Sequence, residues 1–432
     1  MIVYSENITD RLIYVLQYVF EQRLGINFNL ETDIDRFNAD VGLKLNYTAE
    51  SIPNVFQIIP HGLVFEKEIN QKKPEVAYSH KALYLYSNEK GDLKFDIFSA
   101  IFWLLSRYEE FQKFSSDEHG RYPAKESLAY KHEFLKRPIV DEWILEFKTI
   151  LKTFYPDIKI STEDFKVIPT IDVDSPWCYR NKGFRRNFGG IVRDALKQNY
   201  KDIPERLKVL IKIKKDSHYQ FYWIKALFAE LKLSPLFFVL VGKFGKYDKT
   251  VNTNTKTFQE FIDELMDMGE VNIHPSYKAS TSGNILQAEI STLKELVSGN
   301  VLNSRQHFLK IKLPEYYEML VQAGISNDYS LGYADCIGFR AGTSKPFNYY
   351  NLNKEQTEDL RIHPFSIMDV TLNQYLNLNA DKALEACKEI IENTKAVKGN
   401  FVTLWHNESL SEEKEWKGWQ DMYVNMLHLA LD

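Results

Sequence analysis

The sequence has few cysteines, only Cys178, Cys336 and Cys387 in 432 residues. They are too few and too widely spaced for a disulfide framework or a zinc ribbon, and a low, odd count is typical of a reducing compartment. The first residues show no basic segment followed by an apolar one, and no uncharged apolar run approaches the ~20 residues of a membrane span. We therefore predict a cytoplasmic protein without a signal peptide or transmembrane segment.

The chain also lacks an excess of positive charge. Its 54 Lys and Arg against 59 Asp and Glu give a formal net charge of -5, which gives no reason to expect a nucleic-acid partner. Residues 180–215 are locally basic. Such a segment could bind an anionic glycan, a lipid-linked phosphate or a membrane surface, although it is more often a solvated helical face.

Residues 1–160 differ in pattern from the rest of the chain. An amphipathic helix is predicted from about 8 to 23, and short alternating strands follow. Residues 96–111 contain a run, 97–105, that is apolar on all sides and indicates a buried helix. A last helix is predicted over 141–154. We interpret residues 1–160 as a smaller N-terminal α+β accessory domain without an obvious catalytic cluster.

Residues 161–432 alternate between strands and helices. Apolar runs of strand length lie near 166–171, 235–241, 270–274, 301–307 and 400–405, and helical patterns lie between them. Repeated βα units imply a parallel sheet, either closed into a barrel or left open.

Acidic and imidazole side chains stand where these strand-like runs end. Asp172 and Asp174 close the first run, and His274, His307 and His406 close three later ones. The residues that follow parallel strands gather on one rim, and side chains two apart in an extended segment point the same way. Two such close carboxylates need a metal or an arginine to neutralise one of them. A simple turn at Asp174 would leave Asp172 unexplained.

Five segments together resemble a known family. Thr170–Pro176, Thr-Ile-Asp-Val-Asp-Ser-Pro, is similar to the first motif of polysaccharide deacetylases of the NodB-homology type, usually Thr-Phe-Asp-Asp-Gly. Later segments resemble the other motifs in the family's order, namely Ile273–Lys278, Phe339–Ser344, Ile367–Leu372 and Leu404–Asn407. The resemblance covers about 166–432 and implies a distorted (β/α) barrel of the polysaccharide-deacetylase type for residues 161–432.

The resemblance also implies a divalent metal, most simply Zn²⁺. Its ligands would include Asp174 and His274. The family's second motif has another histidine one helical turn later, where this chain has Lys278. His307 is the natural replacement, although it could instead pack under the following helix. An Asp/His/His set suits Zn²⁺ and accepts other first-row divalent ions.

Four further residues take catalytic roles by the same resemblance. Asp172 would be the general base, and Arg340 would pair with it and keep it ionised. His406 would be the general acid that protonates the leaving amine, and Asp369 would support its pKa.

The implied substrate is a carbohydrate, an N-acetylated amino sugar of a polysaccharide or glycolipid precursor. Trp177, Tyr277 and Trp405 are the candidate substrate-binding residues, with backbone N–H groups near Trp177 holding the oxyanion, although Trp405 could equally fill the core. Two alternatives stay open: a catalytically retired glycan-binding or polysaccharide-assembly protein, and a hydrolase of O-acetyl esters or cyclic amides. The sequence does not predict the oligomeric state.

Overall fold

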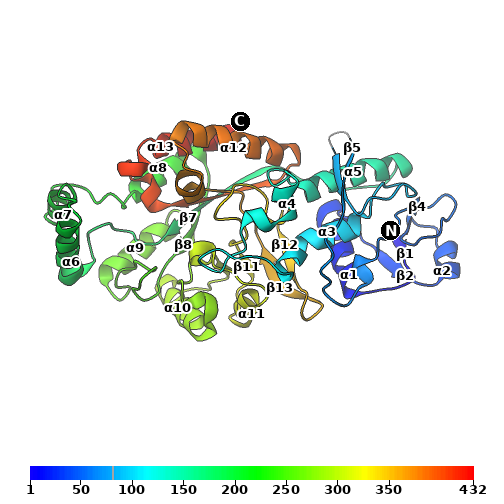
Figure 1. Cartoon of the computed structure of the whole chain (residues 1–432), viewed down its shortest axis with the longest axis horizontal. Coiled ribbons are helices and arrows are strands. Elements are labelled where there is room, and N and C mark those ends of the chain that lie inside the picture. Colours follow the sequence, from blue (N-terminus) through cyan, green and yellow to red (C-terminus); the bar gives the residue numbers. More distant parts are fainter. Residues whose placement is uncertain (80–81) are drawn as a thin grey trace.

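The computed structural model describes residues 1–79 and 82–432. Three parts follow one another along its longest axis (Figure 1): the N-terminal region, a larger region built on one wide sheet, and a pair of helices that stands apart at the far end. None of the helices in the described ranges has the length and apolar character needed to cross a membrane.

The N-terminal region contains a four-stranded sheet of order β2-β1-β3-β4 in which all neighbours are parallel. Helices stand between its first strands, and a chain that returns through a helix pairs its strands in parallel. This sheet is therefore of the α/β type, which differs from the predicted α+β arrangement. The strands are β1 (Ile2–Tyr4), β2 (Asn29–Glu31), β3 (Lys44–Asn46) and β4 (Phe56–Gln57), and an antiparallel pair follows, β5 (Val76–Ser79) and β6 (Ala82–Leu85).

The helices of this region include the predicted buried one. All nine residues of α3 (Ile97–Leu105) are buried, and the Asp96 side chain caps its first turn by accepting from the Phe98 and Ser99 N–H groups. The helix is apolar all round because it is covered on every side. The other helices are α1 (Asp10–Leu16), continued as a π-helical segment (Gln17–Leu24), α2 (Ile34–Ala39), α4 (Leu128–Lys131) and α5 (Ile139–Phe154).

The larger region contains a nine-stranded sheet of order β12-β13-β11-β10-β9-β8-β7-β15-β14, parallel except for the β12–β13 pair. Among the described residues no pairing joins the outer strands β12 and β14, so the sheet is open and the distorted barrel implied by the resemblance is not confirmed. The strands are β7 (Lys166–Val173), β8 (Leu236–Val239), β9 (Glu270–Ile273), β10 (Asn303–Ser304), β11 (Asn327–Asp328), β12 (Phe347–Asn351), β13 (Gln356–Ile362), β14 (Ile367–Met368) and β15 (Asn400–His406).

Amphipathic helices cover this sheet. In α9, four apolar side chains at helical spacing are buried, and the preceding Thr255 side chain caps the helix by accepting from the Phe258 N–H. Burial of that stripe holds the helix against the sheet. The covering helices are α8 (Phe221–Leu231), α9 (Lys256–Met266), α10 (Gly283–Val297), α11 (Glu315–Gln322), α12 (Ala380–Ala396) and α13 (Trp419–Leu431).

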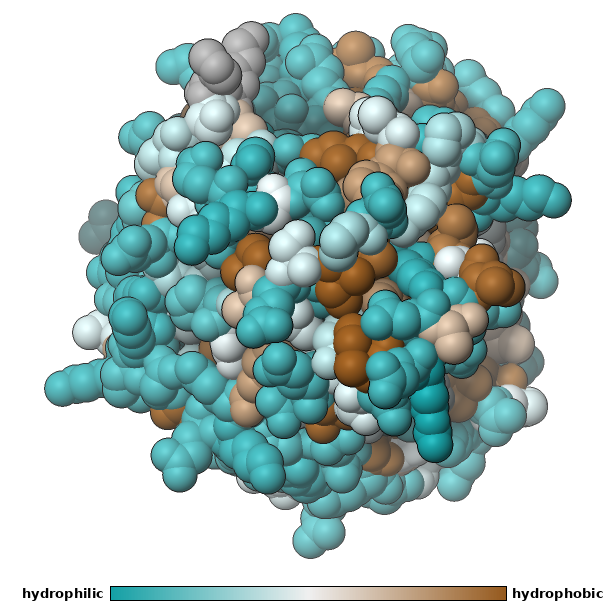
Figure 2. Space-filling view, turned by 90° about the vertical axis from the view of Figure 1, so that its right-hand side faces the viewer, coloured by the Kyte–Doolittle hydropathy of each residue, from teal (hydrophilic) through white to brown (hydrophobic). Residues whose placement is uncertain are grey.

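The N-terminal region packs closely on the larger region. One apolar core runs through both, and buried polar contacts cross between them: Arg11 binds Glu355, and Asp141 accepts hydrogen bonds from the Thr343 and Ser344 hydroxyls. At the outer end of the N-terminal region, hydrophobic residues form small groups among hydrophilic ones (Figure 2).

Candidate metal centre and active site

The carboxyl ends of the central strands meet at one cavity. The cavity has a volume of about 430 Å³. Its wall contains five predicted site residues, Asp172, Asp174, His274, His307 and His406. They lie together because β7, β8, β9 and β10 are parallel neighbours and because β15 pairs with β7 in a register that sets His406 beside Asp172.

Three of these side chains face one another. Asp174 Oδ1 lies 3.2 Å from His274 Nε2, and Asp174 Oδ2 lies 3.2 Å from His307 Nε2. One ligand atom from each of the three residues falls within 4.8 Å of the others. Asp174, His274 and His307 therefore form a compact group of the residue types that hold a divalent metal.

The other ring nitrogens fix which atoms face the centre. His274 Nδ1 lies 2.6 Å from the Arg305 carbonyl, which can only accept, so Nδ1 carries a proton and Nε2 is the acceptor of the neutral ring. His307 Nδ1 lies 2.9 Å from Asp248 Oδ1 in the same way. In the described part of the chain, buried Asp174 Oδ1 and His274 Nε2 have no hydrogen-bond partner. Two acceptor atoms that face each other at this distance can both bind one cation. A hydrogen bond from the other ring nitrogen, here Nδ1, is typical of imidazoles that bind a metal.

The charges within the Asp174, His274 and His307 group shift the pKa values of its members. Burial alone would raise the pKa of Asp174, but the charge and hydrogen bond of His307, with the His274 imidazole close by, hold that pKa well below its usual range. Burial would lower the pKa of His307, yet the charges of Asp174 and Asp248 outweigh it and raise the pKa to about 9. Without a metal, a proton on His307 thus supplies the positive charge that Asp174 requires.

Asp172 pairs with an arginine other than the predicted one. Arg305 Nη1 lies 3.0 Å from Asp172 Oδ1, and Arg305 Nε donates to the Tyr329 carbonyl at 3.0 Å. Arg305 is fully buried, so this ion pair is shielded from solvent. The second oxygen, Asp172 Oδ2, lies 3.7 Å from His274 Nε2 at the metal group.

Arg340 lies elsewhere, which corrects the prediction that it orients Asp172. Its guanidinium binds Glu110 through both terminal oxygens, at 2.9 and 2.7 Å, and donates to the Gly332 carbonyl. Glu110 belongs to the N-terminal region. Arg340 therefore joins the two regions of the chain, and Arg305 takes the place that the resemblance gave to Arg340.

His406 forms a second carboxylate–imidazole unit. His406 Nδ1 lies 2.8 Å from Asp369 Oδ1, and the His406 backbone N–H donates to Asp369 Oδ2 at 2.7 Å. Ser409 also donates to that carboxylate. Burial would lower the pKa of His406, but the charge of Asp369, its hydrogen bond, and the charges of Asp174 and Asp172 raise the pKa to about 10. His406 is thus protonated at neutral pH.

The three predicted substrate aromatics do not line this cavity as expected. Trp405 is fully buried and packs on Tyr423 with ring centroids 4.6 Å apart. It faces away from the cavity because successive side chains of β15 point to opposite faces of the sheet. Leu404 and His406 line the cavity and Trp405 does not. Tyr277 lies beside the cavity, stacked on Tyr247 at 4.2 Å.

Trp177 lies in a different hollow, stacked on Tyr219, and only 3% of its surface is exposed. The backbone N–H groups of the next three residues already have a hydrogen-bond acceptor. Those of Cys178, Tyr179 and Arg180 all donate to the carboxylate of Asp216, at 2.6, 2.9 and 2.9 Å. These three groups are therefore already occupied, which removes them as the expected oxyanion donors.

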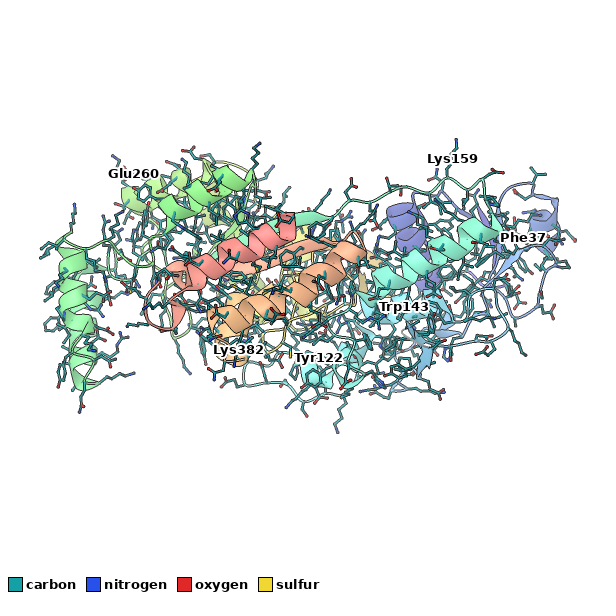
Figure 3. All side chains as sticks on the ribbon, turned by 90° about the horizontal axis from the view of Figure 1, so that it is seen from above. Phe37, Tyr122, Trp143, Lys159, Glu260 and Lys382 are labelled. Carbon is teal, nitrogen blue, oxygen red and sulfur yellow. The ribbon has the colours of Figure 1, made fainter. Side chains whose placement is uncertain are left out.

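The N-terminal region contributes to the cavity, although no sequence pattern indicated this. Glu118 and Arg121 line it, and Arg121 donates to the Phe308 carbonyl at 2.9 Å and to the Tyr375 hydroxyl at 2.8 Å. Tyr122, the next residue along the chain, lies about midway along the longest axis of the molecule (Figure 3). Arg121 thereby holds the loop that directly follows His307.

That loop has an unusual backbone. Phe308 and Leu309 have φ values of 62° and 51°, a left-handed conformation that costs side-chain-bearing residues about 1 kcal/mol or more each. Both residues line the cavity. This backbone conformation directly follows His307, whose imidazole faces Asp174.

Sequence reasoning missed Asp248, Arg305 and Arg121. Arg305 has a usable signal, because it lies near the end of the strand-like run 301–307, two residues before His307, and a buried carboxylate pair needs a cation. Asp248 and Arg121 have no such signal. They stand in irregular segments, and only the fold brings them to His307 and its loop.

Comparisons with known proteins give a family match for the N-terminal residues and a structural likeness over part of the chain. Residues 1–156 match the model of DUF7033, a family of unknown function. No curated protein matches the chain. One similar solved structure is a Mycobacterium smegmatis protein provisionally described as a polysaccharide deacetylase, 11% identical, with a TM-score of 0.40 over 63% of this chain and 86% of that one. That likeness is too weak to support an argument about activity.

Proposed function

We propose that the protein is a metal-dependent hydrolase that removes N-acetyl groups from amino sugars of a polysaccharide or glycolipid precursor. The observation that carries this proposal is the cavity with two unlike sides. Facing acceptors of Asp174, His274 and His307 form one side, and the protonated His406–Asp369 pair forms the other.

The donor set supports a divalent ion held by Asp174, His274 and His307, and two nitrogens with one oxygen suit Zn²⁺. When bound, such an ion would supply Lewis acidity toward the acetyl carbonyl and make a water easier to deprotonate. The Asp248 carboxylate and the Arg305 carbonyl would keep both imidazoles in the tautomer that binds metal.

Asp172 is the proposed general base. Arg305 binds one of its oxygens, so the other oxygen is free to accept a proton beside the metal group. His406 is the proposed general acid. Its high pKa means that it holds a proton at neutral pH, and it can pass that proton to the sugar nitrogen as the C–N bond breaks.

The cavity wall is compatible with a sugar. It combines apolar groups such as Met368 and Leu404 with the aromatic rings of Phe308 and Tyr375, on which the C–H face of a sugar can stack. A volume of about 430 Å³ lies within the range of small-molecule sites. The identity of the sugar and the length of the polymer stay outside this proposal.

The proposal is tested by assaying acetate release from N-acetylated amino sugars with added Zn²⁺. We expect activity in the wild-type protein and its loss in Asp172→Asn and His406→Ala. His428→Ala is the matched control, since His428 is exposed on α13. Unchanged activity in both active-site variants would exclude the assigned roles.

The same assay separates the alternatives. Acetate release only from O-acetyl esters would indicate an esterase on this site. A wild-type protein that binds oligosaccharide but neither binds metal nor releases acetate would be the retired glycan-binding protein instead.

A further inference from the structure

Residues 180–215 form an arm. Its two helices, α6 (Gly183–Leu196) and α7 (Asp202–Leu210), stand apart from the rest of the molecule. Figure 1 shows it at the end opposite the N-terminal region, and the view from above in Figure 3 shows the same separation. At its base, Arg186 donates to the Thr250 carbonyl and Lys214 binds Glu413.

The contact between the two helices is polar. Buried Arg206 of α7 binds Asp194 at 2.6 Å and Asn187 at 3.3 Å, both on α6. Its guanidinium lies so close to Gly190 that a Cβ there would be 2.6 Å from Nη1. A helix pair usually buries its apolar stripe between the helices; here an ion pair occupies that position.

The apolar side chains of the arm face outward instead. Phe184 is 83% exposed, Leu196 80% and Ile213 74%. On α6 the exposed apolar residues recur every four positions and so form one stripe. The exposed set also includes Phe188, Val192, Tyr200, Leu207, Leu210 and Ile211. A concentration of exposed apolar residues on one element marks an interaction surface.

The arm is also strongly basic, unlike the chain as a whole. Residues 180–215 contain twelve Lys and Arg against three Asp and Glu, whereas the whole chain has a net charge of -5. Among its exposed cations are Arg185, Lys197, Lys201, Lys208 and Lys212. The partner that fits this arm must therefore be both apolar and negatively charged.

We propose that the α6–α7 arm binds the surface of an anionic lipid membrane, with its apolar side chains in the interface and its cations against the lipid headgroups. Apolar residues beside Lys and Arg on a helix are the composition of membrane-surface helices. Two arms packed stripe against stripe would bring their positive charges together and repel each other. Nucleic acid would satisfy the cations but would leave the apolar stripe in water.

The arm is connected to the strand whose carboxyl end lies at the cavity. The arm follows β7 directly, and β7 carries Asp172 at its carboxyl end. The arm thus leaves the sheet at the edge where the cavity opens. Membrane binding there would bring the cavity close to lipid-linked molecules, and the binding itself does not depend on the proposed hydrolase activity.

The test is co-sedimentation of the full chain with phosphatidylcholine vesicles that contain or lack phosphatidylglycerol. We expect binding only to the anionic vesicles, weakened by added salt. The double variants Phe184→Ser/Leu196→Ser and Lys197→Glu/Lys201→Glu should each lower vesicle affinity roughly 10-fold or more. Val41→Ser and Lys256→Glu are matched controls, since both residues are exposed and far from the arm in sequence.

Three results would overturn the proposal: no sedimentation of wild-type protein with anionic vesicles, equal binding by the arm variants and the controls, or equal binding to both kinds of vesicle. A lipid-free dimer that dissociates in Phe184→Ser/Leu196→Ser would show that a second copy covers the stripe, and would also overturn it. Acetate release by the arm variants from soluble substrates should be unchanged, so loss of membrane binding and failure of the proposed hydrolase function are distinguishable.

Discussion

The two sides of the cavity satisfy their buried polar groups in different ways. Around Asp174, acceptor faces acceptor, and in the described residues two buried atoms lack a hydrogen-bond partner. Around His406, the donor Nδ1 meets the acceptor Asp369 directly. The first side is completed by adding a cation, whereas the second is complete when it holds a proton. Substitutions should therefore separate metal binding from proton transfer.

The largest effect is expected from removing the metal group. Asp174→Asn and His307→Ala each remove a ligand, so we expect loss of metal binding and a fall in acetate release of roughly 10³-fold or more. Metal content of the purified protein and the rate of acetate release measure the two effects. If His307→Ala kept full metal content, His307 would not be the replacement for the missing histidine at Lys278.

Removing the proton donor should affect only the rate. His406→Ala is expected to lower acetate release about 10²- to 10⁴-fold, the usual range for a general acid, with metal content unchanged because His406 is not in the ligand group. Parallel metal analysis and kinetics make this comparison. A variant that lost metal and activity together would show that the two sides are not independent.

A smaller effect on metal binding is expected at Asp248. Asp248→Asn weakens the partner of His307 Nδ1 without touching the centre, and such changes lower metal affinity by about 10- to 100-fold. Competition titration with a metal indicator measures it. Asp263→Asn on α9 is a suitable control; equal affinity in both variants would contradict the role given to Asp248.

An effect on stability, separate from activity and metal binding, is a pH dependence in metal-free protein. His406 has its pKa raised to about 10, against about 6.5 in an unfolded chain, so its stabilising contribution is full below about pH 6.5 and is lost as pH rises through about 10. The difference in free energy of unfolding between wild type and His406→Gln should shrink over that interval. Urea denaturation with chelator present measures this difference; one that stayed constant would contradict the raised pKa.

The position of the cavity could be predicted from the sequence, because side chains that follow parallel strands lie at the same edge of the sheet. That rule brought Asp172, Asp174, His274, His307 and His406 to one place. The alternation within β15 could also have excluded Trp405, since Leu404 and His406 face the cavity and the residue between them must face away.

Other features depended on long-range packing and could not be read locally. Which arginine reaches Asp172 cannot be predicted locally, because Arg305 directly follows β10, which lies three strands away from β7 in the sheet. The contribution of Arg121 depends on how the N-terminal region docks. Whether the sheet closes depends on its edge strands, and β14 has only two residues, too few to show a pattern.

The most direct test of the central claim is a Zn²⁺ titration of metal-free protein by calorimetry. The account predicts one ion per chain in the wild type and in His406→Ala, and none in Asp174→Asn. A wild-type protein that binds no zinc, or an Asp174→Asn variant that binds it with wild-type affinity, would contradict it.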